Sequence, residues 1–106
     1  MFIAMNRFKI KPGQEQAFEQ VWKARDSHLD GLPGFEEFHL LKGPETNEHT
    51  LYSSHTVWQS KQCFEDWTRS DAFKRAHKNA GNHGDLYLEH PHFEGFEVVQ
   101  ILESSN

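Results

Sequence analysis

Apolar and polar residues alternate over the first ten positions of the chain. The even positions place Phe2, Ala4, Asn6, Phe8 and Ile10 on one face of an extended segment. The odd positions are also apolar as far as position 5. This pattern predicts a strand over residues 1–10 in a sheet that is covered on both faces, by helices on one face and by a second copy of the chain on the other.

A helix is predicted after a turn at Pro12–Gly13. Its apolar positions recur at steps of three and four residues, which is typical of an amphipathic helix, and we expect it to end near residue 28. Glycine and proline at positions 31, 33 and 34 then interrupt the pattern. The stripe consists of Phe18, Val21, Trp22 and Leu29, with Arg25 at the same spacing.

Two further strands are predicted after the first helix. The second strand is predicted over Phe35–Leu41, a polar turn over Gly43–Glu48, and the third strand over about Thr50–Trp58. Because so short a turn separates them, we expect these two strands to pair as a hairpin.

Two helices are predicted between residues 60 and 80. Ser60 is a suitable N-cap for a helix that places Cys63, Phe64 and Trp67 on one face. Ser70 or Asp71 caps a second helix that runs through position 78. The apolar face of this second helix carries Phe73, Ala76, His77 and Ala80.

The remaining residues predict a loop over Gly81–His92 and a final strand over Phe93–Leu102. The order is therefore strand, helix, strand, strand, helix, strand, with the helical segment before the last strand divided in two. This is the order of a ferredoxin-like α+β fold, an antiparallel sheet with helices on one face. We expect a single domain over residues 1–106 that forms a homodimer through its free sheet face. Many unrelated activities use this architecture, so the fold alone does not indicate a function.

Composition and charge narrow the function classes. The chain has 106 residues, a formal net charge of -5 and eleven Lys and Arg residues that are scattered, so nucleic acid is not an expected partner. Asn6, Arg7, Lys9 and Lys11 interrupt the apolar N-terminus, which predicts a cytoplasmic protein without a membrane partner. Cys63 is the single cysteine and is expected to be a small buried apolar residue.

Three residues are candidates for binding chemistry. Asn6 puts an amide on a strand face that should be buried, where it either bonds to neighbouring backbone or donates to a ligand. His77 faces inward from its helix and is either a hydrogen-bonded core residue or a metal ligand. Trp67 is either a core anchor or the wall of a pocket.

Three stretches of the sequence carry a family resemblance. They are the first strand with Asn6–Arg7, residues 56–67 (TVWQSKQCFEDW) and residues 70–78 (SDAFKRAHK). With these stretches, and with Pro33-Gly34-Phe35 at the start of the second strand, the chain resembles the IsdG-type haem-degrading monooxygenases of the antibiotic biosynthesis monooxygenase superfamily. The resemblance extends from residue 1 to about residue 80, and the loop over residues 81–92 does not align.

The resemblance implies a dimeric α+β barrel in which each protomer holds one haem. His77 would be the proximal ligand of the haem iron, coordinating it as neutral imidazole. Asn6 would donate its amide to the distal oxygen ligand, and Trp67 would press on the haem plane and ruffle it. The implied reaction opens the porphyrin with dioxygen and an external electron donor, and it releases iron and an open-chain tetrapyrrole. Because the sequence has no flavin or nicotinamide fingerprint, a small reductant or a partner reductase would supply the electrons.

Other polar residues are weaker candidates for this site. His83, His90 and His92 suggest a divalent metal site, but no spacing among them matches a zinc motif. A solvent-exposed loop that shapes or covers the haem pocket is favoured instead. Three basic residues flank His77 and could bind the haem propionates, or could equally form a solvated helix face; they are Lys74, Arg75 and Lys78. On the first helix, Trp22, Lys23 and Arg25 could border the pocket, although Lys and Arg at a surface also have ordinary solubility roles.

Three other functions are open at this point. The chain could be a haem-free monooxygenase of the same superfamily that oxidises a quinol-like or polyketide substrate, with His77 as a general base. It could be a non-catalytic haem-binding protein that leaves the porphyrin intact. It could also be a dimeric stress or structural protein without a ligand, and the amide of Asn6 argues against this last function.

Overall fold

A four-stranded antiparallel sheet with helices on one face forms the body of the protein. The computed structural model describes residues 1–24, 29–76 and 86–104. The strand order is β2-β3-β1-β4, which confirms the predicted ferredoxin-like α+β fold. The elements are β1 (Phe2–Ile10), α1 (Glu15–Ala24), β2 (Phe35–Glu45), β3 (Thr50–Trp58), α2 (Lys61–Thr68), α3 (Asp71–Ala76) and β4 (His92–Glu97).

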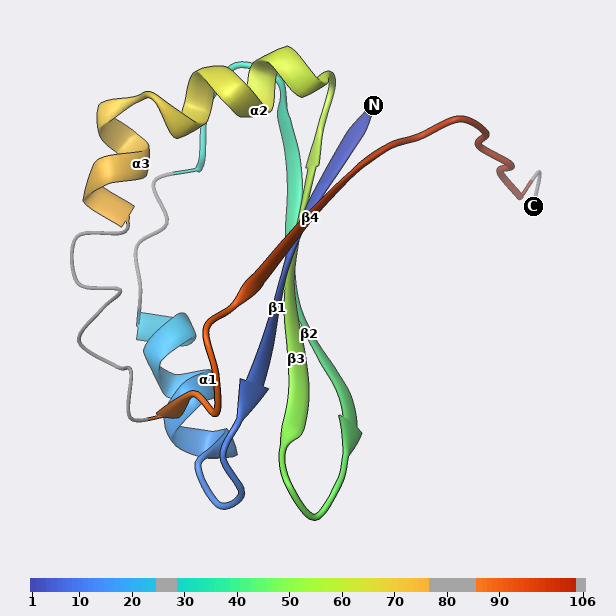
Figure 1. Ribbon diagram of the computed structural model, residues 1–106. Coiled ribbons are helices and arrows are strands. Elements are labelled where there is room, and N and C mark those ends of the chain that lie inside the picture. Colours follow the sequence, from blue (N-terminus) through green and yellow to red (C-terminus); the bar gives the residue numbers. More distant parts are fainter. Residues whose placement is uncertain (25–28, 77–85, 105–106) are drawn as a thin grey trace.

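The helices α1, α2 and α3 lie on the same side of the sheet, and none of them covers its other face (Figure 1). The central strands β1 and β3 pair along their whole length, from Phe2 opposite Trp58 to Ile10 opposite Thr50. No helix among the described residues is long and apolar enough to cross a membrane.

Two separate groups of buried side chains fill the space between the sheet and the helices. The α1 cluster lies under α1, and the α2 cluster lies under α2. Strand β1 contributes to both clusters, because its even positions face the helices as the alternation predicts. The buried members of the α1 cluster are Phe8, Ile10, Phe18, Tyr52 and Leu86, and those of the α2 cluster are Phe2, Ala4, Leu29 and Trp58.

The helix starts follow the predicted capping residues. The hydroxyl of Ser60 accepts a hydrogen bond from the backbone N–H of Cys63 at 3.2 Å, so Ser60 is confirmed as the N-cap of α2. Ser70 Oγ accepts from the backbone N–H of Phe73 at 3.2 Å, which decides the cap of α3 in favour of Ser70 over Asp71. The predicted ends near positions 28 and 78 lie outside the described residues.

The β2–β3 hairpin is longer than the sequence pattern predicts. Strand β2 continues past Leu41 to Glu45, because Lys42 pairs with Tyr52 and, after a register shift, Glu45 pairs with Thr50. The turn is therefore confined to residues 46–49, where the backbone N–H of Thr46 donates to the carbonyl of His49 at 2.8 Å. A polar strand end that pairs on only one side cannot be distinguished from a loop by its composition.

The last strand is shorter than predicted, and the predicted end at Leu102 is wrong. Glu97 pairs with Phe2 at the start of β1, so the neighbouring strand supplies no partner beyond this point. One further hydrogen bond joins the N–H of Val98 to the carbonyl of Met1 at 2.9 Å. Residues 98–104 then run away from the sheet as an arm (Figure 1) on which Val99 is 96% and Leu102 86% exposed.

Part of the predicted loop over residues 81–92 belongs to the core. Leu86 is buried, and its carbonyl accepts from the N–H of Lys11 at 3.0 Å. Tyr87 forms an isolated bridge with Ile10 and packs against the α1 cluster. The expectation of an exposed loop is thus wrong for these two residues, because apolar side chains in it complete the core beneath α1.

Candidate functional site

Asn6 lies at the boundary between the two core clusters. On the helix-covered face of β1 it follows Ala4 of the α2 cluster and precedes Phe8 of the α1 cluster. Its partners across the sheet are Ser54 on β3 and Phe93 on β4. On β1, Asn6 is therefore a polar position between the apolar Ala4 and Phe8, and it lies beside the hydroxyl-bearing Ser54.

The side chain of Asn6 is half-buried, and it makes no hydrogen bond to any residue that the structure describes. A primary amide has two donor hydrogens and a carbonyl acceptor, and leaving them unpaired in a partly desolvated place costs free energy. Of the two interpretations of Asn6, a bond to neighbouring backbone is thus not the one observed. An amide aimed at the space above the sheet is available to a ligand there.

Trp67 faces the sheet from α2 and packs against the α2 cluster. Its ring centroid lies 5.3 Å from that of Trp58 and 4.9 Å from that of Phe73 on α3, in an edge-to-face arrangement with the latter. Contacts of this kind hold an aromatic ring in one orientation. Trp67 is therefore a core anchor on the same side of the sheet as Asn6, and its role as the wall of a pocket stays a prediction.

His77 lies outside the described residues, as do Arg25, Lys78 and His83. The assignment of His77 as an iron ligand thus stays a prediction from the sequence. The described part of α3 ends at Ala76, and its residues Lys74 and Arg75 are exposed.

A pocket of about 380 Å³ opens beside α1, on the helix-covered face of β2 and β3. Trp22 and Phe38 form one wall, with stacked rings whose centroids are 5.7 Å apart. Trp22 and Lys23, which were weaker candidates for the border of the haem pocket, line this pocket beside α1. The remaining lining residues are Glu19, Leu40, Lys42 and Tyr52.

A strong hydrogen bond lies at the base of this pocket. Tyr52 is 1% exposed, and its hydroxyl donates to Glu19 Oε2 at 2.5 Å. Burial, and then the Glu19 carboxylate, raise the pKa of the Tyr52 phenol well above its usual range. The carboxylate of Glu19 also lies 4.0 Å from Lys42 Nζ. The pocket therefore contains one carboxylate with two partners and two lysine ammonium groups.

The sequence pattern did not single out Tyr52, Glu19 or Lys42. Each belongs to a different element, and their meeting depends on how α1 packs across the hairpin. Alternation along β2 does put Phe38, Leu40 and Lys42 on one face, and this signal alone could have indicated a lining surface.

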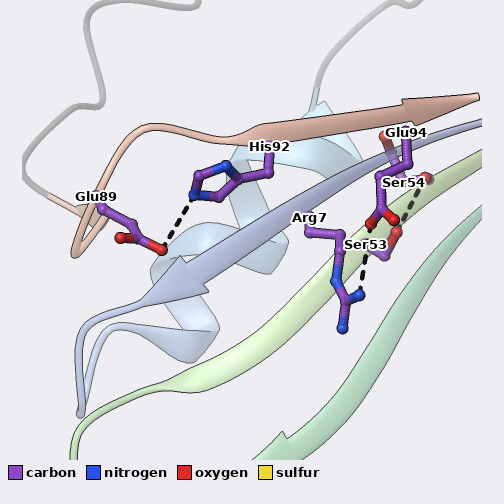
Figure 2. A network of polar contacts seen from close by, with 6 residues as sticks. All are labelled: Arg7, Ser53, Ser54, Glu89, His92 and Glu94. Atoms are coloured by element: carbon purple, nitrogen blue, oxygen red, sulfur yellow. Dashed lines mark hydrogen bonds and ion pairs between the residues drawn. The ribbon is translucent and has the colours of Figure 1, made fainter.

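A second polar region lies on the sheet face away from the helices (Figure 2). Arg7 forms an ion pair with Glu94 at 3.4 Å. The carboxylate of Glu89 contacts two side chains, the His92 ring at 3.3 Å and the Lys9 ammonium group at 3.1 Å. The Lys9 hydrogen bond, opposed by desolvation, lowers the pKa of Glu89. These contacts join β4 and the segment before it to β1.

His92 therefore does not line the space above Asn6. Its register partner is Arg7, and by alternation Arg7 faces away from the side that Asn6 faces. Within the described residues, no group of three or more His, Cys, Asp or Glu side chains could hold a metal ion, so the suggested divalent metal site finds no support among them. Cys63 is partly buried and packs against the α2 cluster, as an apolar side chain would.

The sheet and the helices on one of its faces define a ferredoxin-like α+β protein, and the amide of Asn6 marks a candidate ligand site on the helix-covered face. The chain belongs to the antibiotic biosynthesis monooxygenase family, whose model matches residues 1–79. A staphylobilin-producing haem oxygenase of Staphylococcus haemolyticus is 32% identical over 79 residues, which are 74% of this chain and 75% of that protein. The predicted resemblance to haem-degrading monooxygenases is thereby confirmed.

Solved structures of the same fold include proteins with and without haem. MhuD, a haem degrader from Mycobacterium tuberculosis with two haems bound in its active site, superposes with a TM-score of 0.73 and 23% identity, over 97% of this chain and 100% of that one. SnoaB, a cofactor-independent oxygenase from Streptomyces nogalater, gives a TM-score of 0.70 and 20% identity, over 97% of each chain. At these identities the structures establish the shared fold.

Proposed function

We propose that this protein is a haem-degrading monooxygenase that binds haem between its sheet and helices and opens the porphyrin ring. The observation that carries the proposal is Asn6, whose amide is unbonded among the described residues and lies between two aromatic clusters. The 32% identity to a haem oxygenase supports haem as the ligand.

The residues present suit a flat apolar molecule with a reactive centre. The aromatic rings of Trp67 and Trp22 lie on the helix side of the sheet. On the same side, Asn6 of β1 and its partner Ser54 of β3 supply polar groups. A site with large aromatic side chains and few polar groups is typical of small-molecule and cofactor sites. Haem fits this description.

In this proposal three residues act on the bound haem. His77 would hold the haem through its imidazole. Asn6 would donate a hydrogen bond to the reacting oxygen, and Trp67 would contact the macrocycle and distort it. When bound, haem supplies the oxygen chemistry, and electrons come from an external reductant. The protein itself contributes orientation, a hydrogen bond and a distorted ring.

We also propose a homodimer formed through the uncovered sheet face. Phe96 and Leu41 lie on this face by alternation and are 47% and 41% exposed. The arm over residues 98–104 adds three exposed apolar side chains, Val99, Ile101 and Leu102. A chain of this size gains core by pairing, and sedimentation equilibrium of the purified protein tests the proposal. The proposed location is the cytoplasm.

The experiment that tests the function is an absorbance titration of the purified protein with hemin. Ascorbate is then added in air, with catalase present to remove stray peroxide. The proposal expects saturable binding near one haem per chain and loss of the Soret band after ascorbate. Binding without decay would instead indicate a haem carrier, and absence of binding would refute the proposal.

One observation favours a second candidate, a haem-free oxygenase of the same family. The pocket beside α1 has a volume of about 380 Å³ and contains the Tyr52–Glu19 hydrogen bond, so it could hold an aromatic substrate smaller than haem. Failure to bind hemin, together with oxygen uptake in the presence of a quinol, would favour this candidate.

A further inference from the structure

The pocket beside α1 lies close to the proposed haem site and differs from it in charge. Leu40 lines the pocket and pairs with Ser54, which in turn pairs with Asn6. The pocket wall and the Asn6 amide are thus two strand spacings apart, ~10 Å. This is comparable to the reach from a haem iron to a propionate carboxylate.

The charges in this pocket favour an anion. Glu19 is compensated by the Tyr52 hydroxyl and by Lys42. Lys23 also lines the pocket, and it forms no ion pair with any described residue. The lining residues therefore carry two ammonium groups and one carboxylate, with Lys23 left to bind an incoming negative group.

The shape of the pocket also fits the edge of a macrocycle. Its volume of about 380 Å³ is too small for a whole haem and sufficient for one pyrrole ring with its propionate chain. Phe38 and Leu40 supply apolar contacts for the ring edge, and the lysines stand beside them. An apolar wall next to a cation suits a carboxylate on a hydrocarbon chain.

We propose that Lys23 and Lys42 bind a haem propionate in this pocket and so fix the orientation of the macrocycle above Asn6. The inference rests on the proposed function and adds the residues that select the cleavage position. The four meso carbons of haem are not equivalent, because the propionates lie on one edge of the ring. A macrocycle held by this edge can bind with either face towards Asn6, and the two orientations exchange only the two lateral meso carbons. The propionate contact should therefore limit the number of tetrapyrrole isomers that form.

Two forms of the ligand test the proposal without turnover. Hemin and hemin dimethyl ester, in which both propionates are masked, are titrated into the wild type and into Lys23→Gln, Lys42→Gln and the double variant. We expect the double variant to bind hemin about tenfold more weakly than the wild type, while its affinity for the ester stays at the wild-type value. In a separate assay with turnover, chromatography of the products should show fewer tetrapyrrole isomers for the wild type than for the double variant.

The controls separate this inference from the proposed function. Lys61→Gln, at the exposed start of α2, removes a lysine of the same kind and should leave hemin affinity unchanged. Lys74→Gln tests the rival propionate site on α3. If Lys74→Gln loses affinity for hemin and the Lys23/Lys42 double variant does not, the inference is overturned. Equal affinity of the wild type for hemin and its ester also overturns the inference and leaves the haem function intact. If the wild type binds neither ligand, the proposed function fails as well.

Discussion

The hydroxyl of Tyr52, at the base of the pocket, donates a 2.5 Å hydrogen bond to the Glu19 carboxylate and so joins strand β3 to helix α1. A second contact of the same kind joins Thr50 Oγ1 to Glu15 Oε1 at 3.2 Å. Glu15 and Glu19 are one helical turn apart, so both contacts fall on the same face of α1. This pair of contacts sets how far α1 stands from the hairpin and therefore the width of the pocket between them.

The first prediction concerns the stability that this contact contributes. Tyr52→Phe removes the donor and leaves a partly buried carboxylate without it, which should lower the free energy of unfolding by about 1–2 kcal/mol. Urea denaturation followed by tryptophan fluorescence measures the change. Glu19→Gln keeps an acceptor for the hydroxyl and should cost less. A Tyr52→Phe protein as stable as the wild type would show that the contact contributes nothing net.

The second prediction is a pH dependence on the alkaline side. Burial and Glu19 raise the pKa of Tyr52 in the folded protein, whereas an unfolded tyrosine ionises near pH ~10. Above that pH the unfolded chain binds fewer protons, so stability is fully present below about pH 10 and falls as the pH rises further. Urea titrations of wild type and Tyr52→Phe between pH 8 and 11 should show their difference shrinking above pH ~10. If the difference in unfolding free energy between the two proteins stays constant with pH, the raised pKa of Tyr52 is contradicted.

The third prediction concerns Asn6. Asn6→Ala removes the proposed hydrogen bond to the reacting oxygen, so the variant should degrade hemin roughly 100-fold more slowly. Because the substitution leaves the proposed contacts with the macrocycle in place, hemin binding should stay normal. Single-turnover decay of the Soret band with ascorbate measures the rate. Asn47→Ala, in the exposed β2–β3 turn, is the matched control. Unchanged decay in Asn6→Ala would remove Asn6 from the mechanism.

The fourth prediction concerns His77. His77→Ala should lose tight hemin binding, because imidazole is the proposed protein ligand to the iron. The measurement is a hemin titration followed at the Soret band, with the exposed His90 replaced by alanine as the control. Addition of free imidazole should partly restore the spectrum of the bound haem. Normal binding and degradation by His77→Ala would make the ligand assignment wrong.

The fifth prediction tests the packing between the start of β2 and α2. Gly34 has φ +79°, and a Cβ added there would overlap the side chain of Cys63. Gly34→Ala should therefore cost about 2–4 kcal/mol, from the left-handed backbone and from the overlap together. In the Gly34→Ala/Cys63→Ala double variant the overlap with Cys63 Sγ is removed, whereas the overlap with the Cβ of residue 63 and the backbone cost persist. Thermal unfolding of Gly34→Ala, Cys63→Ala, the double variant and the wild type therefore isolates the contribution of the Sγ overlap.

The sequence by itself determined the elements whose causes are local. The alternation over residues 1–10 specifies which face of β1 is buried, because successive side chains on a strand point to opposite faces. The caps at Ser60 and Ser70 use hydrogen bonds that span three residues. Asn6 also stood out without any coordinates, since a single amide interrupts an otherwise apolar face.

Only the tertiary structure decided the features that depend on pairing between distant segments. Strand β4 ends at Glu97 because its neighbour β1 begins at Phe2, and no property of residues 98–102 shows this. Strand β2 reaches Glu45 because β3 offers Thr50 as a partner. The Tyr52–Glu19 contact and the lysine-lined pocket arise where α1 crosses the hairpin. Helices and strands form from local preferences, but the distances between them depend on how their side chains pack, and this packing shaped the pocket.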